Sequence, residues 1–278
     1  MFSGCKSLTQ APALPATTLA SGCYINMFNG CTSLNQAPAL PATTLANDCY
    51  SYMFQNCTSL AQAPALPATT LASGCYYGMF NDCRSLTKAP ALPATTLARS
   101  CYCYMFGGCI SLAQAPALPA TTLADSCYNQ MFYMCTSLTQ APTLPAMTLA
   151  NNCYDSMFSG CSSLNQAPAL PATKLADNCY NYMFYMCTSL TQAPTIKTYT
   201  PNLNAFYSML NTLNNDQHEW SLTVCNWPDL TLSDVESMVL SESIFGSNGP
   251  GASVRISITC KDGSRTAYYD SSSWVFEY

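Results

Sequence analysis

The sequence LPATTLASGCYINMFNGCTSLNQAPA, residues 14–39, decides the fold, because it returns every 26 residues along most of the chain. Full copies begin at Leu14, Leu40, Leu66, Leu92, Leu118, Leu144 and Leu170, and a degenerate copy begins at Ile196. A fixed period of this length is typical of proteins in which each repeat is one structural unit that packs on its neighbours. A unit this small cannot bury its own apolar side chains. The sequence therefore predicts a solenoid over residues 1–197, with seven full units and partial ones.

Five apolar residues in each unit have the spacing of an amphipathic helix. In the first full unit these residues are Cys23, Tyr24, Met27, Phe28 and Cys31. They fall on one face of a two- to three-turn helix. Six of the seven residues in the column of Ser21 suit a helix N-cap, and five in the column of Gly30 tolerate the left-handed conformation that ends a helix, whereas Met134 and Met186 do not fit. We therefore predict a helix at about residues 22–30 of each unit, with the intervening residues facing water.

The other half of each unit, SLNQAPALPATTL at residues 33–45, is predicted to be extended. Pro38 and Pro41 fix φ and remove backbone donors, so a full parallel ladder cannot form there. We expect a brief strand at about residues 34–38, followed by a polyproline-like stretch. The predicted fold class is an α/β repeat, a leucine-rich-repeat-like solenoid with short helices on one side and short strands on the other.

A motif of the form MFxxCxSL recurs in register in every unit. It reads MFNGCTSL (27–34), MFQNCTSL (53–60), MFNDCRSL (79–86), MFGGCISL (105–112), MFYMCTSL (131–138), MFSGCSSL (157–164) and MFYMCTSL (183–190). This pattern resembles the BspA-like leucine-rich repeats of bacterial surface proteins and covers residues 1–197, about seventy per cent of the chain. The APALPA segment is richer in Pro and Ala than the family pattern. The resemblance implies a secreted or surface-anchored bacterial protein used for adhesion, and it implies no catalytic residues.

Composition limits the classes of partner. Only 8% of the residues are charged, the net charge is −5, and most of the acidic excess lies beyond residue 197. Without a basic stripe, nucleic acid is an unsuitable partner. No apolar run reaches the roughly 18 residues of a membrane span. Met1 occupies the column of Met27, so we expect a fragment whose signal peptide lies outside it, and an extracellular or cell-surface location.

The 18 cysteines form two columns in the repeats, one containing Cys23 and the other Cys31. Eight residues along a helix separate Cα atoms by about 12 Å, too far for a disulfide, and the spacing for zinc is absent. We therefore interpret the columns as buried thiols that act as small hydrophobes. Cys103 stands in an outward column and is expected to be exposed. Cys225 and Cys260 are the candidate disulfide pair, and the sequence is equally compatible with two free thiols.

Residues 198–278 differ in composition and are predicted to form a small α+β cap on the last coil. All three Trp and the single His lie here. The pattern predicts a helix at 203–213, a helix from Ser233 to about Ser243, a strand at 254–260, a hairpin turn at 261–263, a returning strand at 267–269 and a final strand at 274–278. His218 has acidic neighbours but no placed nucleophile. We therefore expect no catalytic residues, no cofactor and no metal site.

Two surface features are candidates for binding. Tyrosines occupy outward columns at Tyr52, Tyr77, Tyr104, Tyr133, Tyr182 and Tyr185, and threonine rows include Thr44, Thr70 and Thr96. The tyrosines could stack on sugars or grip a protein. The leading hypothesis is adhesion to a host extracellular protein or glycan. The alternatives are a solvated face without a ligand, a spacer or rod that associates end to end, and threonine rows that bind ice.

Overall fold

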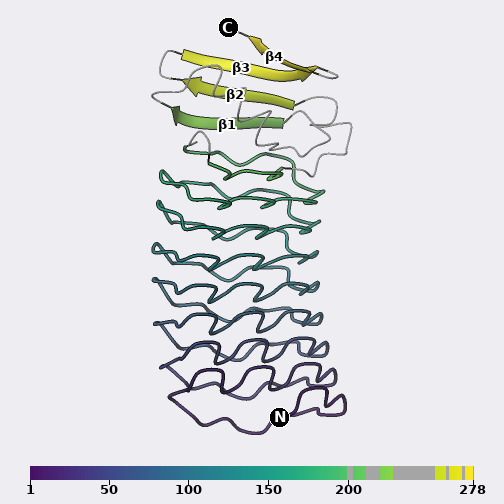
Figure 1. Cartoon of the computed structure of the whole chain (residues 1–278). Coiled ribbons are helices and arrows are strands. Elements are labelled where there is room, and N and C mark those ends of the chain that lie inside the picture. The colour runs from purple at the N-terminus through teal and green to yellow at the C-terminus, as the bar shows by residue number, and fades with distance from the viewer. Residues whose placement is uncertain (199–202, 211–219, 228–253, 261–262, 271–272, 278) are drawn as a thin grey trace.

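The computed structural model describes residues 1–198, 203–210, 220–227, 254–260, 263–270 and 273–277, with side chains described in the first two ranges. The chain winds into a stack of flat coils, with the N-terminus at one end and the C-terminus at the other (Figure 1). Each coil has one turn-rich side and one extended side. The predicted repeat solenoid is therefore confirmed, and its local structure differs from the prediction.

Residues 22–30 and their equivalents, which we call the turn segments, are chains of overlapping turns. Every second N–H group donates to the carbonyl three residues earlier, as from Cys23 to Ala20 at 3.3 Å. The N–H groups between them donate to the following coil, as from Tyr24 to Cys49 at 2.9 Å. Since no described residue is helical, the helix predicted at 22–30 is wrong. The turns satisfy the backbone groups by alternating local bonds with bonds between coils.

This alternation requires a left-handed backbone at every fourth residue of the turn segment. The columns of Gly22, Asn26 and Gly30 have positive φ in all seven full units. Gly, Asn and Asp fill most of these positions, because these residues adopt positive φ at small cost. The left-handed conformation predicted for the column of Gly30 is confirmed. Met134 and Met186, which did not fit the predicted helix end, adopt it too, with φ of 58°.

The extended side contains isolated parallel bridges instead of strands. One set joins the column of Gln36, as in Gln62 to Lys88, and another joins the column of Thr44, as in Thr70 to Thr96. Proline lies between the two sets and has no N–H group to donate. The strand predicted at 34–38 is thus reduced to a single bridging residue, in the units where that bridge forms.

The predicted apolar stripe is confirmed as the core. Phe2, Phe28, Phe54 and their equivalents through Phe184 form one file of stacked rings, with centroids 5.6 to 5.8 Å apart. The tyrosines from Tyr24 to Tyr180 form a second file that ends on Phe206. Tyr50 is 1% exposed and Phe54 is 0% exposed. Each coil therefore covers the apolar side chains of the next.

The thiol columns are also buried, as predicted, apart from Cys5 and Cys23. In the column of Cys31 the Sγ atom donates to a phenylalanine carbonyl of the preceding coil, as from Cys109 to Phe80 at 3.1 Å. Burial raises the pKa of Cys57 to about 12, so the thiol stays protonated. Cys103 was expected to be exposed, and that prediction is wrong: it is 4% exposed, because the turn geometry folds its column against the neighbouring coils.

Residues 203–210 continue the stack rather than form the predicted helix. The N–H of Tyr182 donates to the carbonyl of Tyr207 at 2.9 Å, and Phe206 stacks on Tyr180. The rest of that predicted helix, 211–213, and the helix predicted from Ser233 lie outside the described residues.

A four-stranded sheet lies at the C-terminal end of the stack (Figure 1). Its strands are β1 (Trp220–Trp227), β2 (Val254–Cys260), β3 (Gly263–Asp270) and β4 (Ser273–Glu277), in that spatial order. β1 and β2 are parallel, and the other pairs are antiparallel. The strands predicted at 254–260, 267–269 and 274–278 are confirmed in β2, β3 and β4, except for residue 278, which lies outside the described residues, as do 261 and 262 of the predicted hairpin turn. β1 was not predicted.

Candidate binding face

The outward side chains of the turn segments form a continuous surface, which we call the turn face. They occupy the columns of Ile25, Asn26, Asn29 and Gly30. These columns were expected to face water, but many members are largely covered by the next coil: Ser159 is 5% exposed and Asn81 is 8% exposed. The turn face is therefore packed and ordered, in contrast to a loosely solvated surface.

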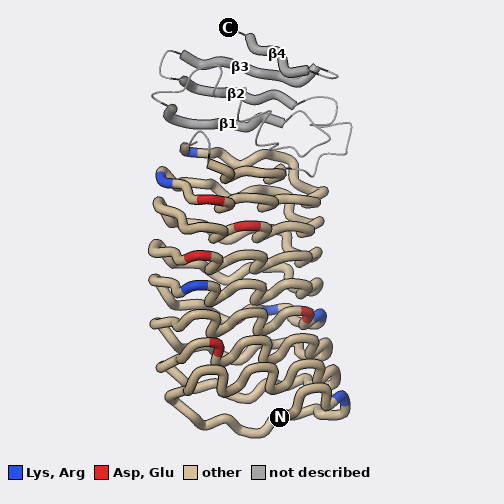
Figure 2. Tube along the Cα trace, viewed as in Figure 1, with Lys and Arg blue, Asp and Glu red and all other residues tan. Residues whose placement is uncertain are grey.

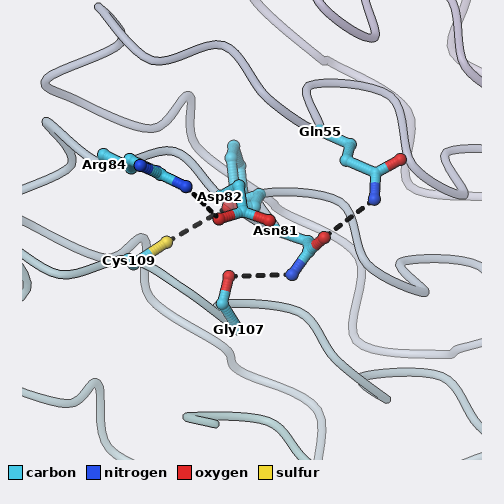
Figure 3. Close-up of polar contacts among 7 residues, drawn as sticks. Gln55, Asn81, Asp82, Arg84, Gly107 and Cys109 are labelled. Carbon is cyan, nitrogen blue, oxygen red and sulfur yellow. Dashed lines mark hydrogen bonds and ion pairs between the residues drawn. The ribbon is translucent and has the colours of Figure 1, made fainter. Parts of the chain in front are cut away.

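Side-chain amides join the coils along this face. Asn29 Nδ2 donates to Gln55 Oε1, and Gln55 Nε2 donates to Asn81 Oδ1, both at 2.8 Å. Asn81 Nδ2 then donates to the carbonyl oxygen of Gly107 at 2.9 Å (Figure 3). Because Gln55 and Asn81 each accept one of these bonds and donate another, the ladder holds their side chains in one orientation.

The structure brings the six predicted tyrosines together in three clusters. Tyr52 contacts Tyr77 with ring centroids 5.1 Å apart, and Tyr104 contacts Tyr133 at 5.9 Å. Tyr182 contacts both Tyr185 at 5.8 Å and Tyr207 at 5.3 Å. Tyr207 was not in the predicted set, because it lies past the last clear copy of the repeat. We call these groups the Tyr52, Tyr104 and Tyr182 clusters.

Glycines make room for two of these rings. A Cβ atom on Gly78 would lie 2.6 Å from the Tyr52 ring, and a Cβ on Gly107 would lie 2.8 Å from the Tyr104 ring. Such a separation is a clash, so only glycine lets each ring lie across the neighbouring backbone. The position of the rings therefore depends on residues in other turns and coils.

Three of the tyrosines occupy the left-handed column of Asn26. Their φ angles are 54° at Tyr52, 60° at Tyr104 and 50° at Tyr182. A bulky residue in this conformation costs about 1–2 kcal/mol relative to the usual right-handed region. The hydrogen bond of each N–H to the next coil, such as Tyr104 to Asn129 at 2.9 Å, holds the strained backbone in place.

Burial shifts the protonation of several groups on this face. It raises the pKa of Tyr104, with a smaller contribution from the neighbouring Tyr133. It also raises the pKa of Asp155, and this shift is opposed by a hydrogen bond from the Ser156 hydroxyl at 2.6 Å. Both shifts favour the neutral form, of Tyr104 and of Asp155.

An open hollow of about 500 Å³ lies beside the Tyr104 cluster. Its lining includes both rings of the cluster, together with Asp82 and Arg84, which form an ion pair at 3.5 Å. Asp82 and Arg84 were not predicted as site residues. Asp82 and Arg84 lie two residues apart in the sequence MFNDCRSL (79–86), and this spacing could have indicated an ion pair. Its place beside Tyr104 follows only from the stacking of the coils.

The predicted threonine rows lie on the extended side. Thr44, Thr70 and Thr96 are all exposed, and the last two are bridge partners. Parallel partners of this kind stand about 4.8 Å apart. The rows are regular and exposed to solvent.

Two further hollows recur at equivalent places on the extended side. One, of about 400 Å³, is lined by residues including Gln10, Pro15 and Pro38. The other, of about 470 Å³, is lined by residues including Gln140, Pro145 and Pro168. Their walls are mainly proline rings and alanine methyl groups, so they offer shape and few directed hydrogen bonds.

A family comparison agrees with the coil geometry. The family model described as "BspA type Leucine rich repeat region (6 copies)" matches residues 1–112 and 76–213. The chain belongs to this family. No curated protein and no solved structure matches the chain. The resemblance inferred from the recurring MFxxCxSL motif is thus confirmed.

Charged groups, metal ligands and membrane-spanning helices were the remaining features to look for in the described residues of this family member. Charged residues are sparse along the stack (Figure 2). Within the described residues, no three His, Cys, Asp or Glu side chains are grouped as metal ligands. The part of the chain with assigned structure includes no apolar helix long enough to cross a membrane. The side chains of Cys225 and Cys260 lie outside the described residues, so their disulfide stays a prediction.

Proposed function

We propose that this protein is a non-catalytic, secreted or cell-surface adhesin whose turn face binds a host extracellular protein or glycan. Proteins of this repeat family are commonly surface repeat proteins. The turn face suits binding because its aromatic side chains are partly exposed and held by a hydrogen-bonded scaffold. Tyrosine provides a large contact area and a polar hydroxyl, and it is enriched at protein interfaces.

The observation that carries the proposal is the backbone strain under three tyrosines. Tyr52, Tyr104 and Tyr182 all have positive φ, in a column where the other four full units have Asn, Gly, Gln or Ser. Residues in unfavourable backbone regions are concentrated at binding and catalytic sites. A tyrosine that lowers stability at three such positions, and that contacts a second tyrosine each time, supports a role in binding.

The test replaces Tyr52, Tyr104 and Tyr182 together by Ser. Wild type and variant are compared on a glycan array and on a panel of immobilised plasma and matrix proteins. We expect the wild type to bind at least one probe and the variant to lose that binding, since the largest contact groups are removed. Circular dichroism should show that the variant keeps its fold, because these side chains lie outside the core files.

The chain offers a matched control on its other side. Thr44, Thr70 and Thr96 replaced together by Ser change three exposed residues of equivalent units without touching the turn face. Binding should survive this change. Loss in the threonine variant with retention in the tyrosine variant would move the binding surface to the threonine rows. Failure of the wild type to bind any probe would favour the spacer or self-associating rod.

A further inference from the structure

The hollow beside the Tyr104 cluster, which we call the Tyr104 hollow, combines residues of three successive coils. Asn81, Asp82 and Arg84 come from one coil, Tyr104 from the next and Tyr133 from the third. Its volume of about 500 Å³ lies within the roughly 300–1,000 Å³ of small-molecule sites. The hollow exists only because the coils are stacked.

The charges of the hollow cancel. Asp82 and Arg84 are the only charged residues in its lining, and their ion pair has one Nη2 to Oδ1 contact at 3.5 Å. Their side chains are 34% and 62% exposed, respectively. A carboxylate can accept several hydrogen bonds and a guanidinium can donate five, so both retain capacity for a ligand. A neutral ligand with adjacent donors and acceptors fits this pair better than an anion or a cation.

The carboxylate is held where a ligand can reach it. A Cβ atom on Gly108 would lie 2.7 Å from Asp82 Oδ1, so the glycine leaves the space that the carboxylate occupies. Next to it, Asn81 is fixed by its bonds with Gln55 and with the Gly107 carbonyl (Figure 3). Groups that are already oriented lose little freedom when a ligand binds.

The remaining walls are aromatic and aliphatic. The rings of Tyr104 and Tyr133 are tilted by 52°, and Ile110 and Met134, at 42% and 41% exposed, complete the rim. A pyranose ring has an apolar C–H face, which packs on aromatic rings, and a rim of hydroxyls that donate and accept. In the hollow, the tyrosine rings match the C–H face, and Asp82 and Arg84 match the hydroxyls.

The other two tyrosine clusters lack this combination. The pair of Asp82 and Arg84 is the single salt bridge among the residues with described side chains. The Tyr52 and Tyr182 clusters therefore offer rings without a paired carboxylate and guanidinium.

We propose that the Tyr104 hollow binds a neutral hexose, with Tyr104 and Tyr133 against the sugar face and Asp82 and Arg84 on its hydroxyls. This inference rests on the proposed function and names the ligand class at one part of the turn face. It predicts selectivity for uncharged pyranoses over uronic and sialic acids, because no net positive charge compensates a ligand carboxylate.

The experiment titrates the protein with methyl hexosides and methyl hexuronides, followed by ligand-observed NMR. Wild type should bind at least one hexoside and prefer it to the corresponding uronide. Asp82→Asn should weaken hexoside binding about tenfold, because a hydrogen bond to a charged carboxylate is stronger than one to a neutral amide. Asn also tolerates the positive φ of 57° at this position, so the fold is preserved.

Asp82→Asn has a second readout that a merely structural role would not produce. The variant leaves Arg84 without its partner and gives the hollow a net positive charge, so the preference should shift toward the uronide. Tyr104→Ser should abolish hexoside binding, whereas Thr96→Ser, at an exposed position on the extended side and outside the lining of the hollow, should leave it unchanged.

The outcomes separate this inference from the proposed function. Absence of hexoside binding, or binding indifferent to both Asp82→Asn and Tyr104→Ser, overturns the hexose site. If an immobilised protein still binds the wild type and not the triple tyrosine variant, the turn face remains an adhesive surface. Conversely, hexoside binding that depends on Asp82 supports the site even if adhesion to arrays survives the triple variant.

Discussion

The Sγ atom of Cys109 lies 3.1 Å from the carbonyl oxygen of Phe80, and this geometry gives the thiol a structural role. The same contact recurs down the column, from Cys31 to Cys187, at 3.0 to 3.2 Å. A thiol is small enough for the core and still satisfies the second lone pair of a buried carbonyl. Serine would be more polar and alanine would leave the carbonyl short of one donor.

Thiol reactivity tests this residue-scale account. Because the thiolate is the reactive form, burial protects the columns both by access and by raising the pKa, to about 11 for Cys103 and about 12 for Cys75. We expect iodoacetamide at pH 8 to label Cys5 and Cys23 and to spare Cys103 and both buried columns. Peptide mass spectrometry locates the labels, with Cys225 and Cys260 scored separately.

The same reaction in guanidinium chloride is the control, and it should label every cysteine. Rapid labelling of Cys103 in the folded protein would mean that its column is exposed after all, as the sequence pattern had suggested.

At the scale of the element, the turn segment shows why the sequence pattern indicated the wrong structure. Apolar residues at i, i+1, i+4, i+5 and i+8 point to one side of a helix, and they also point to one side of a chain of turns that repeats every four residues. The distinguishing signal was the recurrence of Gly, Asn, Asp and Ser at Gly22, Asn26, Gly30 and their equivalents. Such residues every four positions are unfavourable in a helix interior.

On the extended side, the isolated bridges agree with the prediction that a full parallel ladder cannot form, although the strand predicted at 34–38 is not confirmed. Pro38 and Pro41 fix their own φ and lack N–H groups whatever lies next to them. The Tyr104 hollow could not be predicted in the same way, since Asp82, Tyr104 and Tyr133 meet only through the register of three coils.

Substitution at Gln130 distinguishes turns from a helix. Gln130 has φ of 53° and belongs to no tyrosine cluster. In the turn structure Gln130→Gly should be more stable than Gln130→Ala by about 1 kcal/mol, because alanine is strained at positive φ. In a helix the order would be reversed by a similar amount, since glycine is about 1 kcal/mol less favourable than alanine.

Urea denaturation of the two variants measures the difference in the free energy of unfolding. The alanine variant emerging as the more stable would contradict the left-handed backbone of this column. The same comparison at Asn129, whose φ is not among the positive values, should instead show no advantage for glycine and serves as the control.

For the whole molecule, stacking couples every coil to its neighbours through the aromatic files, the thiol columns and the bonds between turn segments. The core was predictable because each unit repeats the same apolar residues at the same positions, so any arrangement that stacks the units buries them. The core of the stack contains buried Cys and Tyr side chains, which must stay protonated for the coils to pack. Burial raises the pKa of Cys49 to about 11 and of Cys127 to about 12, from 9.0 in both cases, and also raises that of Tyr76.

This shared property predicts a steep loss of stability in alkali. A thiol whose folded pKa lies above its unfolded value contributes stability that is complete below the unfolded pKa and is lost as the pH rises through the folded pKa. From about pH 9, each buried thiol that ionises only in the unfolded chain lowers the free energy of unfolding by about 1.4 kcal/mol per pH unit. Many such thiols act together, so the stack should unfold well before pH 12.

Urea denaturation in a reducing buffer between pH 7 and pH 10 measures this slope. Cys75→Ala removes one buried thiol and should make the slope above about pH 9 shallower by up to about 1.4 kcal/mol per pH unit, whatever its effect at neutral pH. Cys23→Ala removes an exposed thiol of the same column and serves as the comparison for the loss of a cysteine at the surface. A free energy of unfolding that stays constant from pH 8 to pH 10 would show that the thiol columns do not stay neutral inside the stack, and the packing of successive coils would then have to differ from the one described.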